Sequence, residues 1–417
     1  MMSNRNKMLN PSLPQELIEE ILVRLPVRSL LRFKRVCKSW LSLISDSKFT
    51  KYHYDLAAEP THRYLSTYDS KVRSIDIEAS LGDHSSVSTH VLPHPFHDSF
   101  YNRIPIFGSC RGFLLVRYEY RYLLVWNPST GVRKLISYPH AKFKYDSLYG
   151  FWYDASTDDY LVLLMVAPEF RPDLADWRTD IVIFSLKTNS WDEIEDFKFP
   201  YQTSHPRTEA GLLLNGALHW LVYSRVTYNF VIIAFDLIQR SVLEIPLPYI
   251  NIQSAFQYRI FYLRVMGDCL CLCNPGSSNR AVAEIWMMKE YKVDSSWTKS
   301  FVLPTNDIPL DSFLPICFTK SEGLFGSNCN GRLVKFNSEG VLSEHCTWRE
   351  NSIFRESLLQ SAIYRESLLS LPGEFGELSE HGQQERQDVS PVCVWLGRAA
   401  GVSYYVQYYG SIYLQKC

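Results

Sequence analysis

Three histidines provide the first spacing in this chain that could support metal chemistry. His90, His94 and His97 recur at steps of four and three residues, which on a helix would place their imidazoles on one face. Pro93 and Pro95 interrupt the same segment, and proline is not tolerated inside a helix. The pattern therefore does not predict a metal site.

Three cysteines alternate with leucines further along the chain. Cys269, Cys271 and Cys273 would share one face of a strand, but a thiolate metal site there would need further ligands from elsewhere. Free cysteine also packs as a small buried hydrophobe. We predict the packing role.

A cluster of aspartates and one histidine are the remaining candidates for chemistry. Asp154, Asp158 and Asp159 fall between two apolar runs, which predicts a solvated turn rather than a calcium site. His219 stands beside Trp220 at the end of a predicted strand, where a structural histidine is expected rather than a catalytic base.

Catalytic motifs are missing from the sequence. It contains no phosphate-binding GxxxxGK loop followed by Ser or Thr, no GxGxxG and no GxSxG. We therefore predict a non-enzymatic protein with no catalytic residue, no cofactor and no metal.

Composition narrows the class of partner and the compartment. The 417 residues carry a net charge of −1, which predicts no bulk attraction to nucleic acid or to an anionic membrane. No apolar run approaches the roughly 20 residues of a membrane helix, and residues 1–10 are polar, unlike a secretory signal. The ten cysteines are scattered as in a reduced protein. We expect a cytoplasmic or nuclear location, or both.

The amino-terminal 50 residues predict three short helices. Apolar side chains recur at helical spacing from Leu17 to Leu25, and Pro26 ends that run. Ser12 and Ser29 are candidate N-caps, and a third apolar run follows Trp40. So small a module holds more apolar side chains than one core can hide. It is either a docking surface for a partner or a cap packed on the following domain.

The rest of the chain predicts a β repeat. A strand ending in an aromatic residue, a polar turn and a second strand recur at residues 123–135, 182–194, 233–245, 284–300 and 333–345. Successive aromatic positions are separated by about 50 residues, the length of a four-stranded propeller blade. We expect these aromatics to fill the space between blades; they are Trp126, Phe184, Phe235, Trp286 and Phe336.

Residues 12–49 resemble the F-box. The family pattern of Leu-Pro, an Ile- and Leu-rich helix, a second Leu-Pro and Val-Cys-Lys-x-Trp matches Leu13-Pro14, Leu25-Pro26 and residues 36–40. The resemblance implies docking on a Skp-type adaptor, and through it on a cullin. It also implies an adaptor-binding surface made of Leu13, Pro14, Ile18, Leu22, Leu25, Pro26, Leu30, Val36, Cys37 and Trp40.

A second resemblance covers residues of about 60 to 373. Asn215-Gly216 with His219-Trp220, and Trp126-Asn127-Pro128, are similar to elements of the F-box-associated domain of plant F-box proteins. The implied fold class is α+β, mainly β, with a short three-helix F-box followed by a β-propeller-like domain. The expected division is 1–10 disordered, 11–57 F-box, 60–373 propeller-like domain and 374–417 an atypical tail.

Two features lie outside the simple family pattern. Residues 353–359 (IFRESLL) are nearly repeated as residues 363–369 (IYRESLL), where relatives usually carry one such element. The target-binding loops are expected at one rim of the propeller, with candidates at 169–178, 201–207 and 274–280.

The resemblance implies a receptor that links an unknown target protein to the adaptor for ubiquitination and degradation. Two other interpretations stay open at this point: a binding module without ligase output, and a propeller-type sugar-binding protein.

Overall fold

The computed structural model describes residues 14–56, 62–68, 71–77, 89–96, 104–118, 122–138, 147–166, 178–203, 210–248, 261–274, 282–304, 313–319, 323–328, 333–346 and 361–372. The predicted disordered segment 1–10 and the tail 374–417 lie outside these residues. By its contacts the chain divides after Pro372, and the fold below belongs to the first of the two units.

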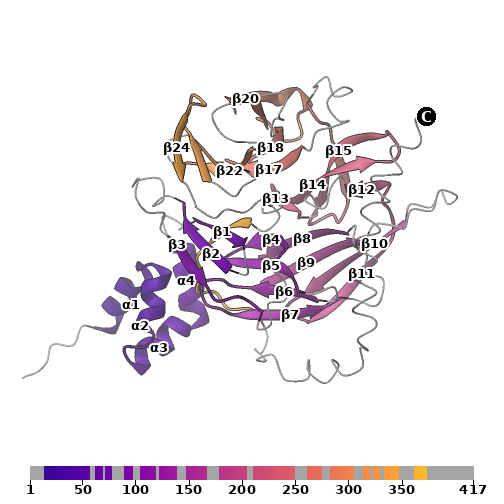
Figure 1. The fold of residues 1–417 in the computed structure, drawn as a ribbon. Coiled ribbons are helices and arrows are strands. Elements are labelled where there is room, and N and C mark those ends of the chain that lie inside the picture. The colour runs from indigo at the N-terminus through magenta and orange to yellow at the C-terminus, as the bar shows by residue number, and fades with distance from the viewer. Residues whose placement is uncertain are drawn as a thin grey trace, which may run out of the picture. The chain divides into compact units, whose positions relative to one another are not determined.

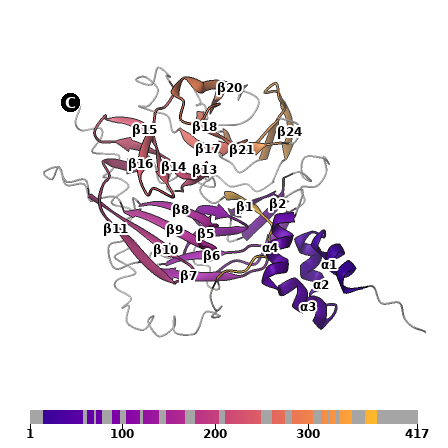
Figure 2. The ribbon, with the colours of Figure 1, turned by 180° about the vertical axis from the view of Figure 1, so that it is seen from behind.

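Four helices open the fold, and they lie together beside the sheets in both views (Figures 1 and 2). They are α1 (Gln15–Val23), α2 (Val27–Phe33), α3 (Lys38–Ser45) and α4 (Ser47–Leu56). The sequence predicted three helices because the last apolar run looked continuous. Asp46 divides that run: its backbone is extended, and its Oδ1 accepts hydrogen bonds from the amides of Lys48 and Phe49. This Asp46 cap starts a separate helix.

Six antiparallel sheets follow and form a six-bladed β-propeller. Blade 1 holds β25 (Ser361–Arg365), β1 (His62–Tyr68), β2 (Lys71–Asp76) and β3 (Thr89–Leu92). Blade 2 holds β4 (Ile106–Cys110), β5 (Phe113–Tyr118), β6 (Tyr122–Trp126) and β7 (Arg133–Ser137). Blade 3 holds β8 (Ser147–Asp154), β9 (Asp159–Val166), β10 (Arg178–Ser185) and β11 (Ser190–Lys198).

The remaining blades contain the carboxyl-terminal half of the repeat. Blade 4 holds β12 (Tyr201–Thr203), β13 (Leu212–Leu214), β14 (Ala217–Ser224), β15 (Asn229–Asp236) and β16 (Val242–Ile245). Blade 5 holds β17 (Tyr262–Met266), β18 (Cys269–Asn274), β19 (Val282–Met288), the short 3-10 helix η4 (Asp294–Ser296) and β20 (Trp297–Pro304). Blade 6 holds β21 (Phe313–Phe318), β22 (Leu324–Asn328), β23 (Leu333–Phe336) and β24 (Leu342–Cys346).

The mainly β fold class with an amino-terminal helical module is confirmed. The five copies found in the sequence are the outer two strands of blades 2 to 6. Blade 1 escaped that search because β2 ends at Asp76 without an aromatic residue, and because its inner strand, β25, comes from the far end of the described chain.

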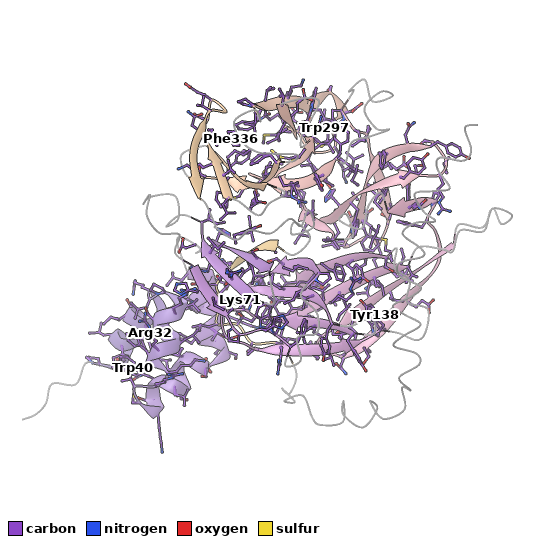
Figure 3. All side chains as sticks on the ribbon, viewed as in Figure 1. Arg32, Trp40, Lys71, Tyr138, Trp297 and Phe336 are labelled. Atoms are coloured by element: carbon purple, nitrogen blue, oxygen red, sulfur yellow. The ribbon has the colours of Figure 1, made fainter. Side chains whose placement is uncertain are left out.

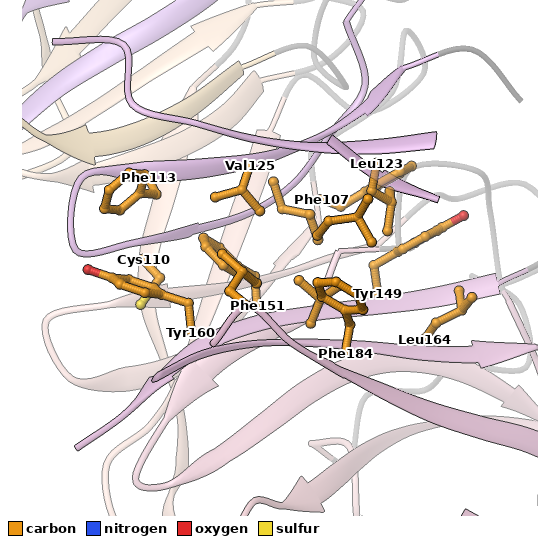
Figure 4. Packing of buried hydrophobic residues seen from close by; sticks show 14 of the residues in the cluster. Phe107, Cys110, Phe113, Leu123, Val125, Tyr149, Phe151, Tyr160, Leu164 and Phe184 are labelled. Atoms are coloured by element: carbon orange, nitrogen blue, oxygen red, sulfur yellow. The ribbon is translucent and has the colours of Figure 1, made fainter. Parts of the chain in front are cut away.

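Hydrophobic packing occurs between blades rather than within them. Six clusters of buried side chains each join two neighbouring blades, including blade 6 with blade 1, so the ring is closed. Figure 4 shows the cluster between blades 2 and 3, where the rings of Phe107 and Tyr149 stack with centroids 3.8 Å apart. The repeat aromatics lie in these clusters as predicted: Trp126, Phe184, Phe235 and Phe336 are buried and Trp286 is half-buried.

None of the helices among the described residues is long and apolar enough to span a membrane.

The turn at Gly112 in blade 2 packs against the carboxyl-terminal segment that follows the closing strand, and this yields a stability prediction. Gly112 has φ +86°, and an added Cβ would lie 2.2 Å from Ser367 Oγ and 2.8 Å from the Arg365 carbonyl oxygen. Gly131 has φ +80° with nothing within 4 Å. We expect Gly131→Ala to cost about 1–2 kcal/mol of backbone strain. Gly112→Ala should cost about 3 kcal/mol or more, because the clash adds to the same strain.

Urea unfolding of the two variants and the wild-type chain measures this difference. Equal losses of stability for Gly112→Ala and Gly131→Ala would show that the closing segment does not constrain the turn.

Candidate functional site

Prolines position the first two helices. Pro14 and Pro26 occupy the N-cap positions of α1 and α2 with ψ of 145° and 146°, an extended backbone in which their carbonyls accept the first helical hydrogen bonds. Proline fixes φ near the value needed and gives up only an amide that has no helical partner. The predicted Ser29 cap is wrong, because Ser29 lies inside α2 and donates its amide to Pro26. Ser12 lies outside the described residues.

The helices share a small core that also contains one residue from the carboxyl-terminal segment of the chain. Leu22, Leu30, Ile44 and Phe49 are buried together, and Leu368 from beyond the last strand, only 4% exposed, packs among them. A module of about 40 residues cannot bury much apolar surface by itself. Leu368 therefore completes the core of the helical module.

Apolar side chains are also left on the surface of this module. Of the fifteen large exposed hydrophobic residues among those described, six lie within residues 14–56. On α1, Leu17 and Ile21 are one turn apart and about half exposed; Val36 is 61% exposed before α3, and Leu41 lies on α3. Trp40 is half-buried and meets Phe33 edge to face, with ring centroids 5.4 Å apart. Figure 3 shows Trp40 on the helical module, away from the sheets.

The ten predicted adaptor-binding residues fall into distinct environments. Pro14, Pro26, Val36 and Cys37 are exposed, and Ile18, Leu25 and Trp40 are half-buried. Leu22 and Leu30 are instead 1% and 0% exposed, so they support the surface from inside rather than form it. Leu13 lies outside the described residues. The predicted set omitted Leu17, Ile21 and Leu41, although helical spacing marks all three as apolar positions and the family pattern includes Ile21.

Cationic residues flank the Val36 part of this apolar surface, whereas Glu16, Glu19 and Glu20 lie around Leu17 and Ile21. Residues 1–57 carry ten Lys and Arg against five Asp and Glu. Lys34, Arg35 and Lys38 flank Val36 and Cys37, and partial burial lowers the pKa of Lys34. Hydrogen bonds, first of all with the Ser39 side chain, lower the pKa of the exposed Cys37 thiol. The site therefore combines apolar contact area with positive charge.

The segment Tyr364–Leu371, here called the clasp, connects the helical module to the propeller. Glu366 accepts hydrogen bonds from Arg28 of α2 at 2.9 Å and lies 3.4 Å from Nε of Arg63 on β1. Its side chain is 7% exposed, and that of Arg63 is 3% exposed. Removing one partner of such a buried pair leaves an uncompensated charge, which typically costs about 3–5 kcal/mol.

Asn127 fixes the clasp to blade 2. Its amide nitrogen donates to the carbonyls of Ser367 and Leu369 at 3.2 Å, while its Oδ1 accepts the amide of Ser129 at 2.9 Å. Asn127 is fully buried. The Trp-Asn-Pro element thus has two structural roles: Trp126 packs between blades, and Asn127 binds the clasp through hydrogen bonds.

Helix α4 meets the propeller through an alternating stack of rings and guanidinium groups. The guanidinium carbon of Arg365 lies 3.8 Å from the Tyr54 ring centroid, and that of Arg111 lies 4.9 Å from Tyr54 and 4.2 Å from Tyr153. Burial raises the pKa of Tyr54, so its phenol stays neutral. Such cation–π contacts contribute about 0.5–2 kcal/mol each. The helices are therefore attached at a defined place.

The aspartate cluster lies at a turn, as predicted, but it is not solvated throughout, because Asp159 begins β9 and is only 4% exposed; Asp158 also contacts α4. Asp154 accepts hydrogen bonds from Ser156 and Thr157, and Asp159 accepts from Ser185 and the Lys187 amide. Asp158 instead pairs with Lys51 of α4 at 2.6 Å.

The other chemical candidates prove structural. Cys271 and Cys273 are buried between blades 5 and 6, and burial raises the pKa of Cys273 to about 12. Among the described residues no group of three His, Cys, Asp or Glu side chains is placed to hold a metal ion. His97 lies outside the described residues.

Two models of known protein families match this chain. The family model described as "F-box associated beta propeller domain" matches residues 63–364, and the F-box domain model matches residues 11–52. The chain belongs to the F-box associated beta propeller family. Both predicted resemblances are thereby confirmed.

Relatives of this F-box protein are found in Arabidopsis thaliana. The F-box/kelch-repeat protein At3g23880 is 28% identical over 78% of this chain and 91% of its own length. The F-box protein CPR1 is 29% identical over 79% of this chain and 82% of its own length. Among solved structures, the extracellular domain of the putative one component system BT4673 from B. thetaiotaomicron matches with a TM-score of 0.37, at 11% identity, over 72% of this chain and 35% of that one.

The strand order of this F-box protein separates two faces of the propeller. Helix α4 contacts the first turn of blade 2 through Arg111 and the first turn of blade 3 through Asp158. In an antiparallel blade the next connection leaves at the opposite end. The candidate rim loops 169–178 and 274–280 follow such opposite ends, at Val166 and Asn274, whereas Thr203 ends β12, a short strand paired with Val222–Ser224 of β14. Residues 169–177, 204–207 and 275–280 themselves lie outside the described residues.

His219 of the family's Asn-Gly-x-x-His-Trp element gives a pH prediction. Its Nδ1 donates to the Leu212 carbonyl at 3.1 Å, so its Nε2 accepts the Tyr291 hydroxyl at 2.8 Å, and burial lowers its pKa to about 4. Above pH 6.5 the ring is neutral in both states. As the pH falls from 6.5 to 4, this imidazole becomes protonated in the unfolded chain but stays neutral in the folded chain. The free energy of unfolding therefore falls by about 3 kcal/mol over this range.

Urea unfolding between pH 7.5 and 4 tests this expectation. The His219→Gln variant keeps a donor and an acceptor, and its stability should depend less on pH than that of the wild-type chain. Identical pH slopes for the two proteins would contradict the assignment.

Proposed function

We propose that this chain is the substrate-recognition subunit of a Skp–cullin–F-box ubiquitin ligase, linking a target protein to the adaptor for ubiquitination and proteasomal degradation. The observation that carries the proposal is the concentration of exposed apolar side chains on a helical module that is an F-box domain. F-box domains generally bind Skp-type adaptors.

The energetics of docking favour this surface. Fully burying a Leu, Ile or Val side chain contributes about 1.5–3 kcal/mol. Four of these side chains are already exposed to solvent, so a partner can cover them without unfolding the module; they are Leu17, Ile21, Val36 and Leu41. Association costs several kcal/mol in lost translational and rotational freedom, and burying this apolar set offsets part of that cost. Trp40 is the expected hot spot, because a half-buried Trp still has much surface to lose.

Charge supports the same partner. The cations around Val36 would attract an adaptor with an acidic surface and speed its association. The proposed place of action is the cytoplasm or the nucleus, where thiols such as those of Cys271 and Cys273 stay reduced.

The proposed mechanism is proximity. The helical module holds the adaptor and the attached cullin, while the propeller holds a target on the face away from α4. Target lysines then meet a ubiquitin-charged conjugating enzyme at high effective concentration. In this proposal the chain forms no covalent intermediate and is not itself an enzyme. The Tyr54 and Asp158 contacts of α4 keep the distance between adaptor and target constant.

A matched pair of aspartate substitutions tests adaptor docking. Ile21→Asp places a charge on the apolar face of α1 and should weaken binding of a purified Skp-type adaptor by about 100-fold. Ile238→Asp makes the same change at a blade 4 turn that is 91% exposed, and should leave binding unchanged.

Isothermal titration calorimetry of the full chain with the adaptor measures both affinities, and circular dichroism checks that both variants fold. The proposal is wrong if the wild-type chain does not bind, or if Ile21→Asp binds as tightly as Ile238→Asp.

A further inference from the structure

The clasp contributes to the helical module as well as to the ring. Leu368 lies in the same buried cluster as Leu22, Leu30 and Ile44. The neighbouring Leu369 points into a different cluster, between blades 2 and 3. One dipeptide thus inserts its two side chains into two cores.

Polar contacts repeat this division. Glu366 is shared between Arg28 of α2 and Arg63 of β1. Arg365 belongs to the closing strand, yet its guanidinium stacks on Tyr54 and donates to the Tyr54 carbonyl. Ser367 is fully buried against Asn127 of blade 2. Every residue from 365 to 369 therefore contacts the helices or the ring, and Arg365 and Glu366 contact both.

The order of the chain makes this arrangement consequential. The helices span residues 15–56, whereas the residue that completes their core lies more than 300 positions later. β25 pairs with β1 as far as Arg365, and Glu366 and Leu368, which contact the helices, follow directly in the chain. Leu368 therefore lies only three residues beyond the strand that closes the ring.

We propose that closing the propeller ring completes the adaptor-binding module, so that only chains with a seated clasp bind the adaptor at full affinity. This inference rests on the proposed function for its partner but not for its structural half. Leu22 of α1 is the chain neighbour of the exposed Ile21, and Leu22 and Leu30 lose one member of their buried cluster when Leu368 is withdrawn. By thermodynamic reciprocity, a bound adaptor also holds the ring closed.

In this proposal, adaptor binding depends on whether the propeller ring of the receptor has closed. A truncated or incompletely folded chain would carry the F-box sequence but not a finished F-box core. The adaptor would then select receptors whose target-binding domain is closed.

Adjacent leucines provide the test. Leu368→Ala and Leu369→Ala remove the same atoms from side chains that are 4% and 3% exposed, one from the helical core and one from the core between blades 2 and 3. Amide hydrogen exchange of the full-length chain without a partner is measured by mass spectrometry. We expect Leu368→Ala to speed exchange in α1 and α2 at least tenfold and Leu369→Ala to speed it mainly in β5 and β9.

Two further variants keep the test decisive. Glu366→Gln keeps the shape of the clasp but removes its charge, and should speed exchange in α2 in the same direction. Because residues 353–359 repeat the clasp sequence, the double variant Leu358→Ala/Leu368→Ala shows whether that copy substitutes for the clasp. Unchanged exchange in α1 and α2 for the double variant and for Glu366→Gln overturns the proposal.

Adaptor binding by the same proteins separates the two proposals. Faster helix exchange together with a tenfold or greater loss of adaptor affinity in the Leu368→Ala or the double variant supports the coupling. Faster exchange with unchanged affinity overturns it. Faster exchange with no adaptor binding by the wild-type chain refutes the proposed function alone, and the structural half of the coupling stands.

Discussion

The pairing of β25 with β1 is the contact on which the rest of this structure depends. It joins the last described strand to the first, completes blade 1, and brings blade 6 into contact with blade 1. A propeller that lacks this pairing exposes two unsatisfied sheet edges and one apolar interface. The clasp that follows β25 carries the same closure into the helical module, through the buried Glu366 and Leu368. Stability of the ring and integrity of the F-box core therefore share one segment.

A simple local rule repeats in blades 2, 4 and 6. Their third strand carries Trp126, Phe235 or Phe336 near its end, this aromatic side chain packs against the preceding blade, and the next residue caps the turn. Asn127, Asp236 and Asn337 each accept amide hydrogen bonds from their own turn in this way. Asn127 differs only in what its amide nitrogen does, because in blade 2 that group faces the clasp. A repeated turn residue has thus acquired a single long-range role.

In the helical module, by contrast, the helices alone do not form a complete hydrophobic core. Its helices begin at prolines and at Asp46, and these local starts fix their lengths. Their length leaves too little interior for all of their leucines. The result is a core that accepts Leu368 and a surface that retains Leu17, Ile21 and Val36 in water. An apolar patch of that kind marks an interaction site more often than not.

Local sequence determined the mainly β class, the roughly 50-residue blade and the inter-blade role of the repeat aromatics, because turns and strand ends are specified within a few residues. The same local pattern placed Asp154 and Asp158 at a turn and predicted a structural histidine at position 219. Only the tertiary structure decided that Leu22 and Leu30 are internal while Leu17 and Ile21 are exposed, since helical periodicity defines a stripe but not which neighbour covers it. Blade 1, the pairing of Glu366 with Arg28 and Arg63, and the place of Leu368 among the helices join residues about 300 positions apart. No spacing in the sequence encodes such contacts, because they exist only once the ring has closed.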